Sequence, residues 1–165
     1  MREGEIHVAM RTILKSLGWT LIAGEFPGGT DHELHPLNVV DPALARDNSP
    51  DPRRHSLGEL IPDIVAVKNN LLLIGEAKSR YSQSDQEKLD VLLNTRSDDL
   101  LLALTTFAIE RNFPILLPLE RFTFCPLLIF NHNSRAPPIE NQQSYLRVIS
   151  FDEGYFEGYL SEVGS

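Results

Sequence analysis

The sequence of 165 residues contains one cysteine, Cys125, so the chain cannot form an internal disulfide bond. Because disulfides persist mainly in oxidising compartments, we expect a cytoplasmic protein. The chain also lacks an apolar run near the roughly 20 residues that a membrane-spanning helix needs. The apolar residues after Met1 are interrupted by Arg11 and Lys15, which is not the pattern of a secretory signal. We therefore expect a soluble protein that has no membrane partner.

An excess of positive charge is also missing. The formal net charge is −8 at pH 7, which argues against a protein that coats nucleic acid by bulk attraction. It does not exclude a nucleic-acid enzyme, because the metal site of such an enzyme must itself be acidic. Acids dominate residues 25–51, whereas bases roughly balance acids over residues 53–88. We expect an anionic substrate to approach this second stretch.

The hydrophobic pattern predicts a single mixed α/β domain over residues 1–165. Hydrophobic residues make up 42% and charged residues 23% of the chain, as in ordinary globular proteins. Apolar residues at helical spacing predict helices, and runs rich in β-branched and aromatic residues predict strands. Two of these strands are joined by a turn at Asn69-Asn70. In order, the expected elements are a helix over 3–17, strands over 19–23, 61–67 and 71–78, helices from a capping box at 84–87 and over 97–111, and strands over 124–130 and 145–151. A polar segment over 27–58, rich in proline and glycine, predicts a long loop insertion with a helical turn near Pro42.

Three ionisable residues interrupt the two strands that otherwise consist of apolar residues. If Asn69-Asn70 forms a two-residue turn, Asp63 lies opposite Glu76, and Lys78 points to the same face. Two carboxylates at such a distance repel each other unless a cation joins them or one is protonated. Oxygen ligands of this kind suit Mg²⁺ or Mn²⁺, and a neighbouring lysine can assist a water or stabilise charge. The pattern predicts metal-assisted hydrolysis of a phosphodiester.

At these residues the chain resembles a known family. Pro62-Asp63, twelve further residues and then Glu76-Ala77-Lys78 resemble the PD-(D/E)XK motif of restriction endonucleases, junction resolvases and related DNA-processing enzymes. The resemblance covers roughly residues 3–130. It implies a restriction-endonuclease-like core, which consists of a helix, three strands of a mixed sheet, a helix and a further strand, here with the 27–58 loop inserted.

The resemblance also implies roles for individual residues. Asp63 and Glu76 would bind the metal with the carbonyl of Ala77, and Lys78 would serve the attacking water. Glu5 on the first helix would be a further catalytic residue, with an ordinary helix-terminal acid as the alternative. The implied partner is DNA, and a homodimer or larger nuclease complex is expected because cutting both strands of a duplex usually needs two sites.

Several alternatives stay open at this point. Arg53, Arg54 and Arg80 are candidate contacts to the nucleic-acid backbone, or else solvated surface residues. Of Gln86 and Lys88 on the following helix, only one can face the site, and a solvated helix face is the simpler interpretation. Asp63, Glu76 and Lys78 could instead form a solvated ion pair of little energetic value. The alternative function is a non-catalytic nucleic-acid-binding or assembly module on the same fold.

Overall fold

A computed structural model describes residues 2–27, 33–40, 59–135 and 144–160. Its elements are α1 (Glu3–Ser16), β1 (Thr20–Gly24), β2 (Val39–Val40), β3 (Glu59–Leu60), β4 (Ile64–Lys68), β5 (Leu71–Ala77), α4 (Gln83–Asp90), a π-helical turn (Val91–Thr95), α5 (Ser97–Glu110), two 3₁₀ turns (Pro114–Leu116 and Leu119–Arg121), β6 (Thr123–Asn131), β7 (Ser144–Ser150) and β8 (Tyr155–Tyr159). No helix in these described ranges is long and apolar enough to cross a membrane.

Six of the strands form one mixed sheet in the order β1-β4-β5-β6-β7-β8. The strands β1, β4 and β5 are antiparallel neighbours, whereas β5, β6 and β7 run parallel, and β8 returns antiparallel to β7. All seven residues of β5 are buried, as expected for a central strand that is covered on both faces. The remaining strands β2 and β3 form a separate two-stranded ribbon.

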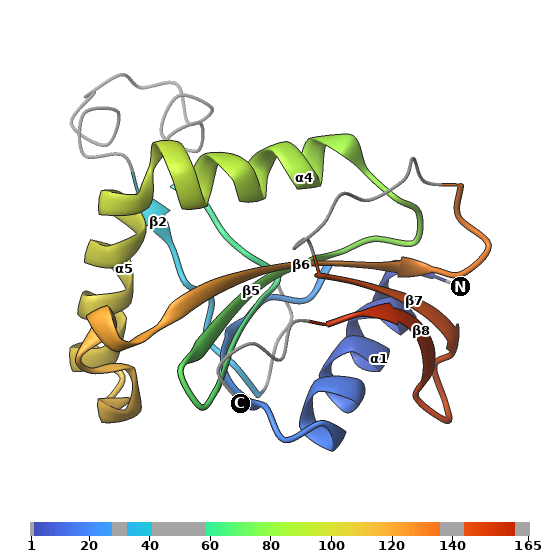
Figure 1. Cartoon of the computed structure of the whole chain (residues 1–165), viewed down its shortest axis with the longest axis horizontal. Coiled ribbons are helices and arrows are strands. Elements are labelled where there is room, and N and C mark those ends of the chain that lie inside the picture. Colours follow the sequence, from blue (N-terminus) through green and yellow to red (C-terminus); the bar gives the residue numbers. More distant parts are fainter. Residues whose placement is uncertain (1, 28–32, 41–58, 136–143, 161–165) are drawn as a thin grey trace.

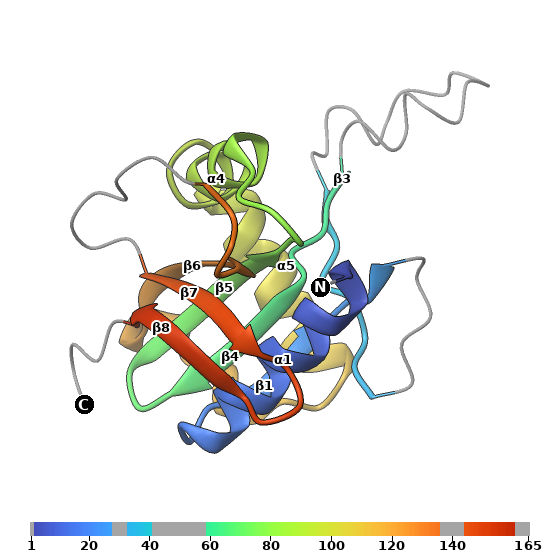
Figure 2. The ribbon, with the colours of Figure 1, turned by 90° about the vertical axis from the view of Figure 1, so that its right-hand side faces the viewer.

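Helices cover both faces of the sheet, so the fold has three layers (Figures 1 and 2). Helix α1 packs on one face and contributes Ile6, Met10 and Ile13 to a core with apolar residues of β4–β7. On the other face, α5 contributes Leu100 and Leu104 to a second core. The helical period of the apolar residues in α1 explains this arrangement, because one stripe of the helix faces the sheet.

The structure confirms the α/β class, the mixed sheet and the turn between β4 and β5. Asn69 adopts a positive φ of 54°, and Lys68 pairs with Leu71 and Ile64 with Gly75. This is the register that a two-residue turn dictates. Gly18, which follows α1, has a φ of 90°, a conformation that glycine adopts without steric cost.

Three details of the fold differ from the sequence prediction. The sheet has six strands, which is two more than the core implied by the resemblance and one more than the five strands predicted along the chain. The strand that was not predicted is β8, because its exposed residues and its glycine at 158 show no apolar alternation. Helix α4 is capped by Ser82, whose hydroxyl accepts from Asp85 N–H at 3.3 Å, and not by Ser84. The expected 27–58 loop contains β2, while the helical turn predicted near Pro42 lies outside the described residues. The likeness to a restriction-endonuclease core stays a prediction.

Candidate active site

The structure brings Asp63 and Glu76 together where the β4–β5 ladder ends. Asp63 lies directly before β4, and its N–H donates to the carbonyl of Gly75 at 3.1 Å. The N–H of Ala77 in turn donates to Asp63 Oδ2 at 2.8 Å. Because both hydrogen bonds involve backbone groups of β5, the Asp63 carboxylate is held in place by the strand that carries Glu76.

Glu76 is an acid in the core of the protein, with only 3% of its surface exposed. Burial, and next the nearby carboxylate of Asp63, raise the pKa of Glu76 to about 9. Lys88 acts in the opposite direction, because its Nζ lies 2.7 Å from Glu76 Oε1. This contact is an ion pair that is not aligned as a hydrogen bond. A further cation near these oxygens would therefore be stabilised.

Lys88 reaches the site from α4, and its Nζ also donates to the carbonyl of Ile61 at 2.7 Å. Of the two residues that the sequence left open, the structure thus places Lys88 toward the carboxylates. Gln86 instead accepts a hydrogen bond from the hydroxyl of Tyr81 at 2.5 Å. The prediction of a solvated helix face is wrong for Lys88, because its side chain is only 24% exposed and contacts Glu76.

Lys78 follows β5 and keeps a more open position, with 45% of its side chain exposed. Its Nζ lies 3.4 Å from Glu3 Oε1. Burial lowers the pKa of Lys78, but the carboxylates around it, Glu3 first and then Asp85 and Asp63, outweigh burial and leave the pKa raised. Lys78 is therefore a charged donor at this site.

The glutamate of α1 that reaches the site is Glu3 and not Glu5. The Oε2 atom of Glu5 accepts from the N–H of Arg2 at 3.0 Å, which closes a capping box at the helix start. Glu5 thus satisfies a backbone donor that the helix leaves free. Along the helix the two residues are separated by two positions, so their side chains point in different directions.

His7 is a further residue of the site that sequence reasoning missed. Its side chain is 1% exposed, and Nε2 lies 3.8 Å from Asp63 Oδ2 and 3.9 Å from Glu3 Oε1. Burial is the largest influence and leaves the pKa of His7 lowered, although the carboxylates of Asp63 and Glu3 and the carbonyl of Ala77 act to raise it. Neither ring nitrogen forms a well-aligned hydrogen bond in the described part of the chain. A histidine next to Ile6 on the apolar stripe of α1 was the signal available in the sequence.

These groups line an open cavity of about 370 Å³. Its lining combines acidic, basic and apolar side chains from five segments: Glu25, Leu60, Ile61, Asp63, Glu76, Lys78, Asp85 and Lys88. Four carboxyl groups and two ammonium groups thus share one hollow. Such a lining suits a substrate that is itself charged.

The donor set can be tested for a divalent metal. Within the described residues, no group of three or more histidine, cysteine, aspartate or glutamate side chains is arranged to hold a metal ion. Mg²⁺ needs less than this, because it commonly keeps several waters and binds one or two carboxylates together with substrate phosphate. Asp63 and Glu76, with the carbonyl of Ala77 beside them, supply oxygen atoms only, and Glu76 is buried next to the carboxylate of Asp63. These residues fit a hard cation.

Of the three arginines expected to bind nucleic acid, the structure describes only Arg80. Arg53 and Arg54 lie outside the described residues. Arg80 lines a neighbouring hollow rather than the cavity of Asp63 and Glu76. Comparisons with models of protein families, with curated proteins and with solved structures find no match for this chain.

Proposed function

We propose that this protein is a divalent-metal-dependent nuclease that hydrolyses phosphodiester bonds in DNA. The observation that carries the proposal is the convergence of Asp63, Glu76 and Lys78 at the adjoining ends of β4 and β5, in an open cavity. The ammonium group of Lys88 adds a second positive charge from α4. Carboxylates for a metal and lysines for a phosphate are the parts that such a hydrolysis requires.

Each residue has a separate role in this proposal. Asp63, Glu76 and the carbonyl of Ala77 would hold Mg²⁺ or Mn²⁺, which when bound supplies Lewis acidity toward a phosphoryl oxygen and a more acidic water. Lys78 donates to the attacking water and offsets negative charge that develops on the phosphate. Glu3, at 3.4 Å, positions the Lys78 ammonium group. Lys88 limits the repulsion between the two carboxylates before a cation arrives.

The test is cleavage of plasmid and of single-stranded DNA by the purified protein, with Mg²⁺, with Mn²⁺ and with EDTA. We expect cleavage only with a metal, and a loss of at least roughly 100-fold in Asp63→Asn and Glu76→Gln, because each change removes a metal ligand. The same variants should lose the rise in melting temperature that metal binding causes. Asp152→Asn, at an exposed turn, is the matched control. Normal cleavage by both site variants would show that the active site lies elsewhere.

The second candidate is a non-catalytic nucleic-acid-binding or assembly module. One observation favours it: Lys88 Nζ lies 2.7 Å from Glu76 Oε1, close to where a metal ion would have to bind that oxygen. A protein in which this ion pair is permanent should show no Mg²⁺-dependent stabilisation that disappears in Asp63→Ala. A metal titration followed by thermal melting therefore separates the two functions. The expected homodimer stays a prediction in both.

A further inference from the structure

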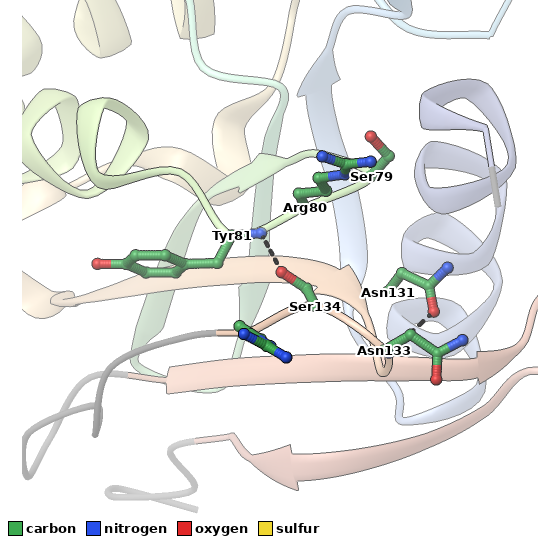
Figure 3. A pocket seen from close by; sticks show the side chains of 7 residues that line it. Ser79, Arg80, Tyr81, Asn131, Asn133 and Ser134 are labelled. Atoms are coloured by element: carbon green, nitrogen blue, oxygen red, sulfur yellow. Dashed lines mark hydrogen bonds between the residues drawn. The ribbon is translucent and has the colours of Figure 1, made fainter.

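A second hollow, of about 600 Å³, lies where the parallel strands β5 and β6 end (Figure 3). The last residue of β6 and residues of the segments that follow the two strands line it: Ser79, Arg80, Tyr81, Asn131, Asn133, Ser134 and Arg135. Its volume is that of an ordinary small-molecule site. Ser79 follows Lys78 directly, so this hollow, termed here the arginine pocket, begins one residue beyond the candidate active site.

Hydrogen bonds from backbone N–H groups fix the two walls of the arginine pocket to each other. The N–H of Asn131 donates to the carbonyl of Ser79 at 3.3 Å. The N–H of Tyr81 donates to Ser134 Oγ at 2.7 Å, the bond drawn in Figure 3. Within the second wall, Ser134 N–H donates to the carbonyl of Asn131 at 2.9 Å. The pocket therefore has walls that are positioned before any ligand binds.

The charge of the arginine pocket is opposite to that of the whole chain. Two arginines line it and no acid does, although the chain carries 23 acidic and 15 basic residues. Both arginines are exposed residues, and neither forms an ion pair with a carboxylate of the described residues. A guanidinium group offers several donors in a planar fork that matches a phosphate. The pocket is thus suited to an anionic group.

The lining does not offer an aromatic face to a base. The ring of Tyr81 packs edge-on against Phe130 with 5.9 Å between ring centroids, and its hydroxyl donates to Gln86. In Figure 3 this ring points away from Asn131 and Asn133. Without base stacking, contacts to phosphate and sugar remain, and such contacts carry no sequence information.

We propose that the arginine pocket binds one nucleotide of the substrate strand, with its phosphate between Arg80 and Arg135. This inference rests on the proposed nuclease function, because it makes the bound phosphate a neighbour of the one that is cut. Arg80 lies two residues past Lys78, which is at most about 7 Å of chain. The amide groups of Asn131 and Asn133 supply further polar contacts to phosphate or sugar. The strand is bound in the same way whatever its base sequence.

The experiment measures binding without cleavage. A fluorescein-labelled single-stranded oligonucleotide of mixed sequence is titrated with protein in EDTA, and anisotropy is followed at several salt concentrations. The proteins are wild type, Arg80→Gln, Arg135→Gln and the double variant. Arg111→Gln is the matched control, since Arg111 is an exposed arginine at the end of α5. Thermal melting verifies that each variant is folded.

We expect each pocket variant to bind roughly 10-fold more weakly, because each loses a charge-assisted contact to phosphate. The slope of log affinity against log salt should fall by about 0.7 in each single variant and about 1.4 in the double variant. Arg111→Gln should bind like wild type, and oligonucleotides of different base composition should bind alike.

Three results would overturn the proposal. The double variant could bind like wild type, or Arg111→Gln could lose as much affinity as the pocket variants, which would indicate bulk attraction. Alternatively, wild type could bind a free nucleoside monophosphate or inorganic phosphate at the two arginines and no oligonucleotide. None of these measurements depends on catalysis. Loss of binding in the pocket variants would support the nucleotide site even if no cleavage were found. If the wild type cleaved DNA and the double variant bound it normally, the nucleotide site would be excluded and the nuclease function would not.

Discussion

At the scale of single residues, the acid–base state of Glu76 dominates the energetics of the candidate site. Its pKa is raised from 4.5 to about 9 by burial and by Asp63. The folded protein therefore holds this proton more tightly than the unfolded chain, so folding stability is lost as the pH rises from about 4.5 toward 9. At neutral pH the free energy of unfolding of the metal-free protein is already lowered in part by this effect. A neutral side chain of the same shape would avoid the loss.

Glu76→Gln is accordingly expected to stabilise the metal-free protein at pH 7. The gain should be about 1–3 kcal/mol, because a buried amide costs less than a buried carboxyl group that must be charged or protonated. In a chain of this size this corresponds to a rise in melting temperature of roughly 2–10 °C. Lys88 keeps its contact to the carbonyl of Ile61. Glu120→Gln, at an exposed position, should change nothing, and a Glu76→Gln variant that melts lower in EDTA would contradict the buried cost.

The two lysines should have separable effects. Lys78→Met is expected to reduce cleavage by at least roughly 100-fold and to preserve the metal-dependent rise in melting temperature, because Lys78 serves the reaction and not the metal. Lys88→Met should instead tighten Mg²⁺ binding several-fold, because the ammonium group 2.7 Å from Glu76 Oε1 no longer competes for that oxygen. Calorimetric titration with Mg²⁺, beside cleavage assays, checks both. Equal metal affinity in wild type and Lys88→Met would mean that the metal does not use Glu76.

The sequence was sufficient to place Asp63 opposite Glu76, because a two-residue turn fixes the register of a hairpin completely. Glu3, His7 and Lys88 could not be placed in this way. Whether they reach the site depends on how far α1 and α4 are rotated about their axes when they pack on the sheet, which is a property of tertiary packing. The same reason explains why the sequence indicated Glu5, although Glu3, two positions away, is the glutamate that lies against Lys78.

At the scale of elements, α1 carries two glutamates with different roles: Glu5 caps the helix, and Glu3 lies against Lys78. Glu5→Ala should destabilise the protein by about 0.5–1.5 kcal/mol, because the N–H of Arg2 loses its acceptor. Its cleavage rate per folded molecule should be unchanged. Glu3→Ala should reduce the cleavage rate roughly 10-fold with little change in KM, because Lys78 loses the group that positions it. Melting curves and steady-state kinetics distinguish the two variants. The reverse assignment, with activity lost in Glu5→Ala alone, would restore Glu5 to the site.

Elements with a strong hydrophobic period were the ones that the sequence predicted well. Helix α1 and the strands β4 and β5 lie within a few residues of their expected bounds, because one apolar stripe or a continuous apolar run specifies each. β8 shows no such pattern, since it is an exposed edge strand that buries little apolar surface. The start of α4 was misplaced because two serines, Ser82 and Ser84, both resemble a cap and only the geometry selects one.

At the scale of the whole molecule, the net charge of −8 opposes the binding of DNA. The carboxylate of Asp63 adds to this repulsion where the phosphate must lie, and Glu76 beside it adds to the repulsion when it is ionised. Positive charge is present locally, in Lys78, Lys88 and the arginine pocket. A divalent cation at Asp63 and Glu76 would make this acidic point attractive to a phosphate.

DNA binding by wild type is therefore expected to depend on divalent cations. Replacing Asp63 and Glu76 by neutral side chains should remove this dependence. Ca²⁺, a hard cation with oxygen ligands, should strengthen the binding of a labelled oligonucleotide to wild type at least several-fold over EDTA at equal ionic strength. The Asp63→Asn/Glu76→Gln double variant should bind equally with Ca²⁺ and with EDTA, because both cation ligands are gone. It should bind more tightly than wild type in EDTA, because the negative charge of Asp63 is gone. Fluorescence anisotropy measures both affinities. If Ca²⁺ strengthened binding to the same extent in both proteins, it would be acting on the charge of the molecule as a whole rather than at these two residues.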